Sequence, residues 1–270
     1  MISRGALGHV RYYGFRGLFN LVLVLLVLPL LLVLLLGISS ATGIDFPSGL
    51  SLTHFAHILD SPGLRASLGI SLIIASATAL LATILGTLAA VGLARMRLPG
   101  RILLVSLVVA PMVIPAAVWA LGLRFVLEPL GLLGSFTGLI LAHTVLTAPL
   151  VFVAVSLSLR SLPTRLLYAG LSLGADAVDV FRTITVPLMM PGIVAGVMIA
   201  FVVSLGDVAV SLMLGGNALQ TLPVSMFKDA RLNVDAAQAA IGSVLIVAAA
   251  LAAAGVTAMR RWHDRLWGTE

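Results

Sequence analysis

The chain has 270 residues and no cysteine, so disulfide bonds, thiol catalysis and zinc sites with cysteine ligands are excluded. Charged residues are also scarce, because Asp, Glu, Lys and Arg together make up only 10% of the sequence. A soluble domain carries roughly 25% charged residues, mostly on its surface. Such a surface cannot be built here, so much of the protein must face lipid.

Lysine occurs once, as Lys228 in the run Met226-Phe227-Lys228-Asp229, and no glycine-rich run precedes it. The chain therefore has no P-loop of its own, and any ATP-driven process needs another subunit. The basic residues lie between apolar blocks and are not interleaved with aromatics, which argues against nucleic acid. The sequence shows no Ser-His-Asp signature and no paired carboxylates, and we assign neither a catalytic residue nor a metal ligand.

Apolar residues dominate instead: they make up 60% of the chain, and the mean hydropathy is +1.18. A helix that crosses a bilayer needs about 20 mostly apolar residues. Six stretches meet this requirement: 18–38, 68–94, 102–127, 136–159, 193–214 and 236–259. The predicted fold class is therefore an all-α membrane protein with about six transmembrane helices.

The predicted domains are a short N-terminal segment, a first helix, a core of five helices and a tail, at 1–17, 18–40, 66–259 and 260–270 respectively. A cleaved signal peptide is the alternative for the first helix. Its apolar run is longer than an ordinary signal core, and Ser39-Ser40-Ala41 is a weak cleavage site, so we expect the helix to be retained.

The positive charges predict the orientation, since cytoplasmic connections carry the excess of Arg and Lys. With the N-terminus inside, four of the 16 basic residues lie outside: Arg65, Arg124, Lys228 and Arg231. The other twelve lie inside, so both termini are expected in the cytoplasm.

The connection 160–191 is the one long cytoplasmic segment, and its apolar residues recur at helical spacing. Pro163 suits the first turn of a helix, and Asp176 suits an N-cap with Asp179 three residues on. We expect two short helices with a break near Gly174, ended by Pro187 and Pro191. Such a segment either rests on the membrane surface or docks into the groove of a soluble partner.

The run Tyr168-Ala169-Gly170 … Gly174 … Ile184-Thr185-Val186-Pro187 resembles the cytoplasmic "EAA" loop of binding-protein-dependent ABC importer permeases. The family pattern is Glu-Ala-Ala, three residues, Gly, nine residues, Ile, any residue, Leu and Pro. The spacing agrees throughout, but Tyr168 replaces the glutamate, Gly170 the second alanine and Val186 the leucine. A salt bridge that the family makes through that glutamate cannot form here.

A second block supports the resemblance and is most like the polyamine permeases. It comprises 201–207, Gly215-Gly216-Asn217 and 221–227, while Pro111-Met112-Val113-Ile114-Pro115 also fits. The resemblance implies a type I importer permease that couples to cytoplasmic ATPase subunits through its loop. The implied coupling residues are Tyr168, Ala169, Gly170, Gly174, Ala175, Asp176, Phe181, Arg182, Ile184 and Pro187.

The resemblance also implies the partners: a second permease, expected to be non-identical, two ATP-binding cassette subunits that hold ATP and Mg, and an extracytoplasmic binding protein. No cofactor is expected on this chain. A polyamine or other small organic cation is the first choice of substrate. Thiamine, an aminophosphonate, sulfate or molybdate, and ferric iron are the alternatives within the family.

Polar and irregular residues inside the predicted spans suggest a translocation pathway. Its candidate residues are Pro111, Pro115, Trp119, His143, Asp207 and Ser211. All of them except Ser211 have a structural alternative: Asp207 solvated or paired with Arg124 at the outer surface, His143 neutral and bonded to a neighbouring helix, Trp119 in packing and the prolines as simple bends.

Two further classes stay open from sequence. An intramembrane enzyme would use His143 and Asp207, and a structural membrane protein would merely dock a partner through the loop. We expect Arg124 and Glu128 to form an exposed pair one helical turn apart. Pro149 is a further proline within a span, and the Gly/Ala-rich last span suits close packing.

Overall fold

The computed structural model describes residues 4–40, 49–95, 99–216, 218–230 and 236–267. Within these ranges the chain is helical, and its one β-type contact is an isolated antiparallel bridge between Ser39 and Leu50. Ala41, Arg97, Asn217 and Arg231, which entered the sequence argument, lie outside the described residues. The prediction of an all-α fold is confirmed.

The chain forms two compact units. One comprises Met1–Ser61 with Asp229–Ile246, and the other comprises Pro62–Lys228 with Val247–Glu270. The first contains α1 (Arg4–Gly37), α2 (Thr53–Asp60) and the beginning of α12 (Ala236–Trp267). Within it, the Ser243 hydroxyl donates to the carbonyl oxygen of Val33 at 3.2 Å, which ties α12 to α1. The apolar side chains of α1 are exposed along most of its length, as suits a helix that faces lipid or another protein.

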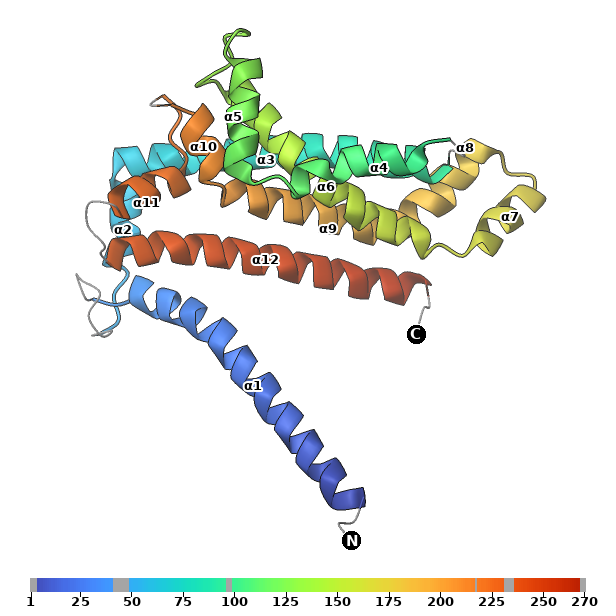
Figure 1. Ribbon diagram of the computed structural model, residues 1–270, viewed down its shortest axis with the longest axis horizontal. Coiled ribbons are helices and arrows are strands. Elements are labelled where there is room, and N and C mark those ends of the chain that lie inside the picture. The colour runs from blue at the N-terminus through green and yellow to red at the C-terminus, as the bar shows by residue number, and fades with distance from the viewer. Residues whose placement is uncertain (1–3, 41–48, 96–98, 217, 231–235, 268–270) are drawn as a thin grey trace. The chain divides into compact units, whose positions relative to one another are not determined.

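The second unit is built on three long helices, α3 (Pro62–Arg95), α6 (Phe136–Arg160) and α9 (Val186–Leu205), which lie side by side in Figure 1. Small residues let them approach closely. A Cβ on Gly86 of α3 would lie 2.7 Å from Cβ of Val151 on α6, and one on Gly196 of α9 would lie 2.8 Å from Cγ1 of the same valine. Val151, fully buried, is therefore the point at which all three helices meet.

The third predicted span is not one straight helix. It consists of α4 (Arg101–Val109) with a 3₁₀ turn at Ala110–Met112, followed by α5 (Ala116–Leu127), and the two halves are bent by 103° (Figure 1). Pro115 immediately precedes α5 and has no N–H to continue the ladder from α4. By contrast, Pro149 lies inside α6 without ending it. Among the described residues, counting the bent pair as one span gives six candidate spans by length and composition, in agreement with the sequence; otherwise five helices qualify.

The remaining helices are short. α7 (Thr164–Ser172) and α8 (Ala177–Val180) lie at one end of the bundle, and α10 (Ala209–Leu214) and α11 (Leu222–Ala230) lie toward the other (Figure 1). The fifth span was predicted as one stretch at 193–214, but the helix there begins earlier and is broken before α10. The apolar helix runs from Ala177 to Leu205, and the chain then breaks at Gly206–Val208 before α10. The break follows from Gly206 and Asp207, which end α9 and begin the turn into α10.

Candidate coupling loop and intramembrane polar site

The loop begins with α7, which follows Pro163 directly, and the chain turns at Gly174, just after α7. Gly174 has φ +88°, a left-handed conformation that glycine adopts without strain. The N–H of Gly174 donates to the carbonyl of Leu171 and the N–H of Ala175 to that of Gly170, at 3.1 and 3.2 Å. This pair of bonds is a Schellman motif, which closes a helix C-terminus. The predicted break at Gly174 is present.

α8 begins at the predicted cap. The carboxylate Oδ1 of Asp176 accepts hydrogen bonds from the N–H groups of Val178 and Asp179, both at 2.8 Å. These are two of the N–H groups that a helix start leaves without an intrahelical acceptor, and a carboxylate there also complements the helix dipole. Gly174 and Asp176 thus fix a sharp turn between two helices over three residues.

The close contact between the two arms of the loop is at Gly170 and not at Gly174. Apart from the neighbours of Gly174 in the chain, no atom of the described residues lies within 4 Å of the position of a Cβ on Gly174, whereas a Cβ on Gly170 would lie 3.0 Å from Cδ1 of Ile184 and 3.1 Å from Cγ2 of Val180. Gly174 allows the chain to turn because it adopts a positive φ. Gly170 serves the packing through its missing side chain.

The sequence predicted that Pro187 and Pro191 end the helix of the loop. This prediction is wrong, because the helix continues through both residues. A π-helical turn at Phe181–Thr185 joins α8 to α9, and the N–H of Val186 donates to the carbonyl of Phe181, five residues back. Pro187 then falls in the first turn of α9, where its lack of an N–H is tolerated, and Pro191 lies inside the helix. The loop therefore continues without interruption into the fifth span.

The surface of the loop is apolar where it projects farthest. Leu173, next to the turn, is 88% exposed and Tyr168 is 69% exposed, and no residue of α7 is buried. Arg165 and Arg182 of the same loop are also exposed. Exposed apolar side chains at the tip of a hairpin are typical of a surface that contacts another protein or a membrane.

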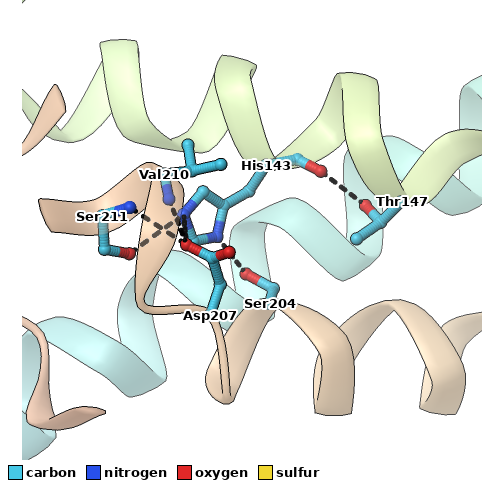
Figure 2. Close-up of polar contacts among 6 residues, drawn as sticks. All are labelled: His143, Thr147, Ser204, Asp207, Val210 and Ser211. Carbon is cyan, nitrogen blue, oxygen red and sulfur yellow. Dashed lines mark hydrogen bonds and ion pairs between the residues drawn. The ribbon is translucent and has the colours of Figure 1, made fainter. Parts of the chain in front are cut away.

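A second polar feature lies inside the bundle, around His143 of α6 (Figure 2). Its Nδ1 lies 2.8 Å from the hydroxyl oxygen of Ser204 near the end of α9, and its Nε2 lies 3.1 Å from that of Ser211 on α10. All three side chains are buried. The imidazole thus joins the two pieces of the broken fifth span, in agreement with a histidine bonded to neighbouring helices.

Asp207 lies in the break itself. Its Oδ2 accepts hydrogen bonds from the N–H groups of Val210 and Ser211, both at 3.0 Å, and lies 3.6 Å from Nε2 of His143. The carboxylate caps α10, and 15% of its side chain is exposed. Its predicted alternative partner, Arg124, instead lies 3.5 Å from Glu128 in an exposed pair. Pairing of Asp207 with Arg124 is therefore wrong, and the Arg124–Glu128 pair is as expected.

The structure brings His143, Asp207 and Ser211 together but leaves the other pathway candidates on another element. Pro111 and Pro115 flank the bend between α4 and α5, and Trp119 is on α5. The Nε1 of Trp119 is buried without a hydrogen-bond partner among the described residues. The role of all six in a pathway stays a prediction. Sequence reasoning missed Ser204, although its place three residues before Asp207, at the same break, was a signal.

The family described as "Binding-protein-dependent transport system inner membrane component" matches residues 82–267. The chain belongs to this family. It is a multi-pass inner-membrane protein and a permease of the type I ABC importer class.

Named relatives place the chain near the polyamine permeases. It is 30% identical over 246 residues to the putrescine transport system permease protein PotI of Escherichia coli (strain K12), covering 87% of this chain and 84% of the relative. It is also 29% identical to the molybdenum transport system permease protein ModB of Mycobacterium bovis, covering 82% and 87%. These proteins are permeases, that is, transport components.

Solved structures show the same fold. A bacterial ABC transporter involved in the import of the acidic polysaccharide alginate gives a TM-score of 0.62 at 14% identity, covering 97% of this chain and 99% of that one. The MetNI methionine ABC transporter in an inward-facing form gives 0.61 at 20% identity, covering 75% and 99%. At these identities the likeness concerns the fold alone.

Proposed function

We propose that this protein is the permease subunit of an ATP-driven importer for a polyamine or another small organic cation. It forms the substrate pathway with a second permease and couples to cytoplasmic ATPase subunits through the loop around Gly174. The observation that carries the proposal is the helical element from α8 to the end of α9. An exposed apolar hairpin is joined through a π-turn to a spanning helix, so a displacement of one moves the other.

Coupling requires a stiff connection, and three features of the loop supply it. The Schellman motif at Gly174 and the Asp176 cap fix the turn, while Ile184 packs against Gly170 and holds the two arms together. A partner that binds the exposed side chains of Tyr168 and Leu173 therefore moves the whole loop as a rigid body. Rigid-body tilting of the spans then exchanges inward-facing for outward-facing access.

The energy for this movement comes from other chains. The sequence has one lysine and no glycine-rich phosphate loop, so we assign ATP and Mg to two ATP-binding cassette subunits. The remaining partners are a second permease, which we take to be non-identical, and an extracytoplasmic substrate-binding protein. The loop is on the cytoplasmic face, and both termini lie on the same side, as the Arg and Lys distribution predicts.

The choice of substrate is supported by the relatives and by one side chain. The relatives include permeases named for putrescine and for spermidine with putrescine. Asp207, with 15% of its side chain exposed inside the bundle, offers a carboxylate to a cation at the break of the fifth span. The likeness to ModB makes molybdate the specific alternative, and an acidic group near the pathway disfavours that oxyanion.

An intramembrane enzyme receives less support from the same site. Ser204 and Asp207 approach opposite nitrogens of His143, as in a nucleophilic set. However, Ser204 and His143 are buried, and the carboxylate oxygen that faces the ring is already engaged by two N–H groups of α10. We therefore assign this cluster no catalysis, and we take His143, Ser204 and Ser211 to join α6, α9 and α10.

The test uses the complete transporter in proteoliposomes, with Gly174→Asp compared with Gly174→Asn. Both side chains tolerate the left-handed backbone, so the pair differs mainly in charge at the docking tip. We expect Gly174→Asn to retain ATP-dependent uptake of labelled putrescine and Gly174→Asp to lose both uptake and substrate-stimulated ATP hydrolysis. Full coupling in Gly174→Asp would contradict the docking role. Uptake of molybdate in place of putrescine would contradict the proposal that the substrate is an organic cation.

A further inference from the structure

A cavity of about 450 Å³ lies between α3, α4 and α6, close to the start of α7. This volume is within the range of about 300–1,000 Å³ that is usual for small-molecule sites. None of the residues that the proposed function assigns to coupling or to the pathway lines it. The cavity is therefore a separate feature of the second unit.

The two ends of the cavity differ in chemistry. Arg101, Arg160 and Thr164 line one end, where α4 and α7 begin and α6 ends. Val109 and Phe152 line the other. From Arg101 to Val109 the helix rises roughly 12 Å, at 1.5 Å per residue, so the site is cationic at one end and apolar along its depth.

The two arginines are available to a ligand. Neither guanidinium has a carboxylate or hydrogen-bond partner among the described residues, and no acidic residue lines the cavity. Arginine is suited to phosphate because its planar fork donates two parallel hydrogen bonds. The first N–H groups of α4 and α7 reinforce the positive potential beside Arg101 and Thr164.

The position of the cavity in the membrane indicates which kind of anionic ligand it binds. Its cationic end lies level with the ends of two membrane-spanning helices, Pro62–Ala94 and Phe136–Arg160, and its apolar end extends between the spans. With the orientation proposed above, that level is the headgroup region of the cytoplasmic leaflet, where anionic lipids attract arginine. A cationic cargo would be repelled by the same two side chains.

We infer that this cavity binds an anionic phospholipid from the cytoplasmic leaflet, with its phosphate between Arg101 and Arg160 and part of an acyl chain against Val109 and Phe152. The inference rests on the proposed orientation and not on the identity of the cargo. The bound lipid fills the space between α4 and the α3–α6 pair and joins α4 to the base of the coupling loop.

The experiment measures lipid binding by the complete transporter, without cargo or ATP. Nanodiscs of phosphatidylcholine contain graded amounts of phosphatidylglycerol, and lipids retained after mild release are counted by native mass spectrometry. We expect Arg101→Gln or Arg160→Gln to lower the affinity for phosphatidylglycerol about fivefold, and the double variant about 25-fold. Arg124→Gln, an exposed arginine outside this cavity, should leave it unchanged.

A second variant tests the space rather than the charge. Ser156 lines the cavity, so Ser156→Phe should displace the lipid while both arginines stay. Equal retention of phosphatidylglycerol by the double arginine variant, or equal binding of phosphatidylcholine by the natural protein, would overturn the inference. So would complete displacement by inorganic phosphate, or a segment of a partner subunit found in the cavity. Failure of putrescine uptake would bear on the proposed substrate alone.

Discussion

Ile184 occupies the space that a side chain on Gly170 would fill: a Cβ there would lie 3.0 Å from Cδ1 of Ile184. The contact joins the outgoing arm of the coupling loop to the returning one. Cδ1 is the far end of a flexible side chain, so it can move by a few tenths of an ångström. A methyl group therefore fits after a small shift, but a branched side chain does not.

We predict that Gly170→Ala retains coupled uptake, in keeping with the alanine that the family pattern has at this position. Gly170→Leu should separate the two arms and reduce uptake at least tenfold while ATP hydrolysis becomes independent of substrate. Proteoliposome uptake and ATPase assays measure both quantities. Normal coupling in Gly170→Leu would show that the arms need not touch.

Asp176 provides a second test of the stiffness of the loop. Asp176→Ala removes the acceptor of two N–H groups at the start of α8, a loss of about 1 kcal/mol. Asp176→Asn keeps an acceptor and serves as the matched control. We expect weaker substrate stimulation of the ATPase in the alanine variant alone. Equal loss in both variants would assign the effect to the charge of Asp176 rather than to the cap.

The shape of the loop was predictable because its signals are local. A glycine with a positive φ and an aspartate followed by free N–H groups specify a helix end and a helix start within three residues. The connection at Pro187 was not predictable by the same rules. Proline usually marks a helix boundary. Here the π-turn before Val186 places Pro187 in the first turn of α9, and the local sequence does not predict a π-turn.

The intramembrane site was only partly predictable, for a different reason. Sequence singles out His143, Asp207 and Ser211 because polar groups are rare in spans, but it cannot say which helices face one another. The partners of His143 are 61 and 68 residues away along the chain. Likewise, the 103° bend between α4 and α5 depends on what surrounds Pro115, and the sequence shows only that a bend is possible.

His143 and Ser204 should behave as one unit in stability measurements. Ser204→Ala leaves Nδ1 of a buried ring without its partner, which we expect to destabilise the fold by about 1 kcal/mol. His143→Leu should cost more, because Ser204 and Ser211 both lose their partner. The double variant should be no less stable than His143→Leu alone. The apparent Tm of the purified complex gives all three values, and strictly additive losses would show that the two side chains are not coupled.

Asp207 combines two roles that one substitution can separate. Asp207→Asn removes the charge but keeps an oxygen that can accept from the N–H groups of Val210 and Ser211, whereas Asp207→Ala removes both. If the charge contributes to the recognition of a cation, Asp207→Asn raises the KM for putrescine about tenfold while the Tm of the complex changes little. Asp207→Ala lowers the Tm as well, because α10 loses its cap. Unchanged uptake in a stable Asp207→Asn transporter would remove the carboxylate from the pathway and leave Asp207 as a purely structural cap at the break of the fifth span.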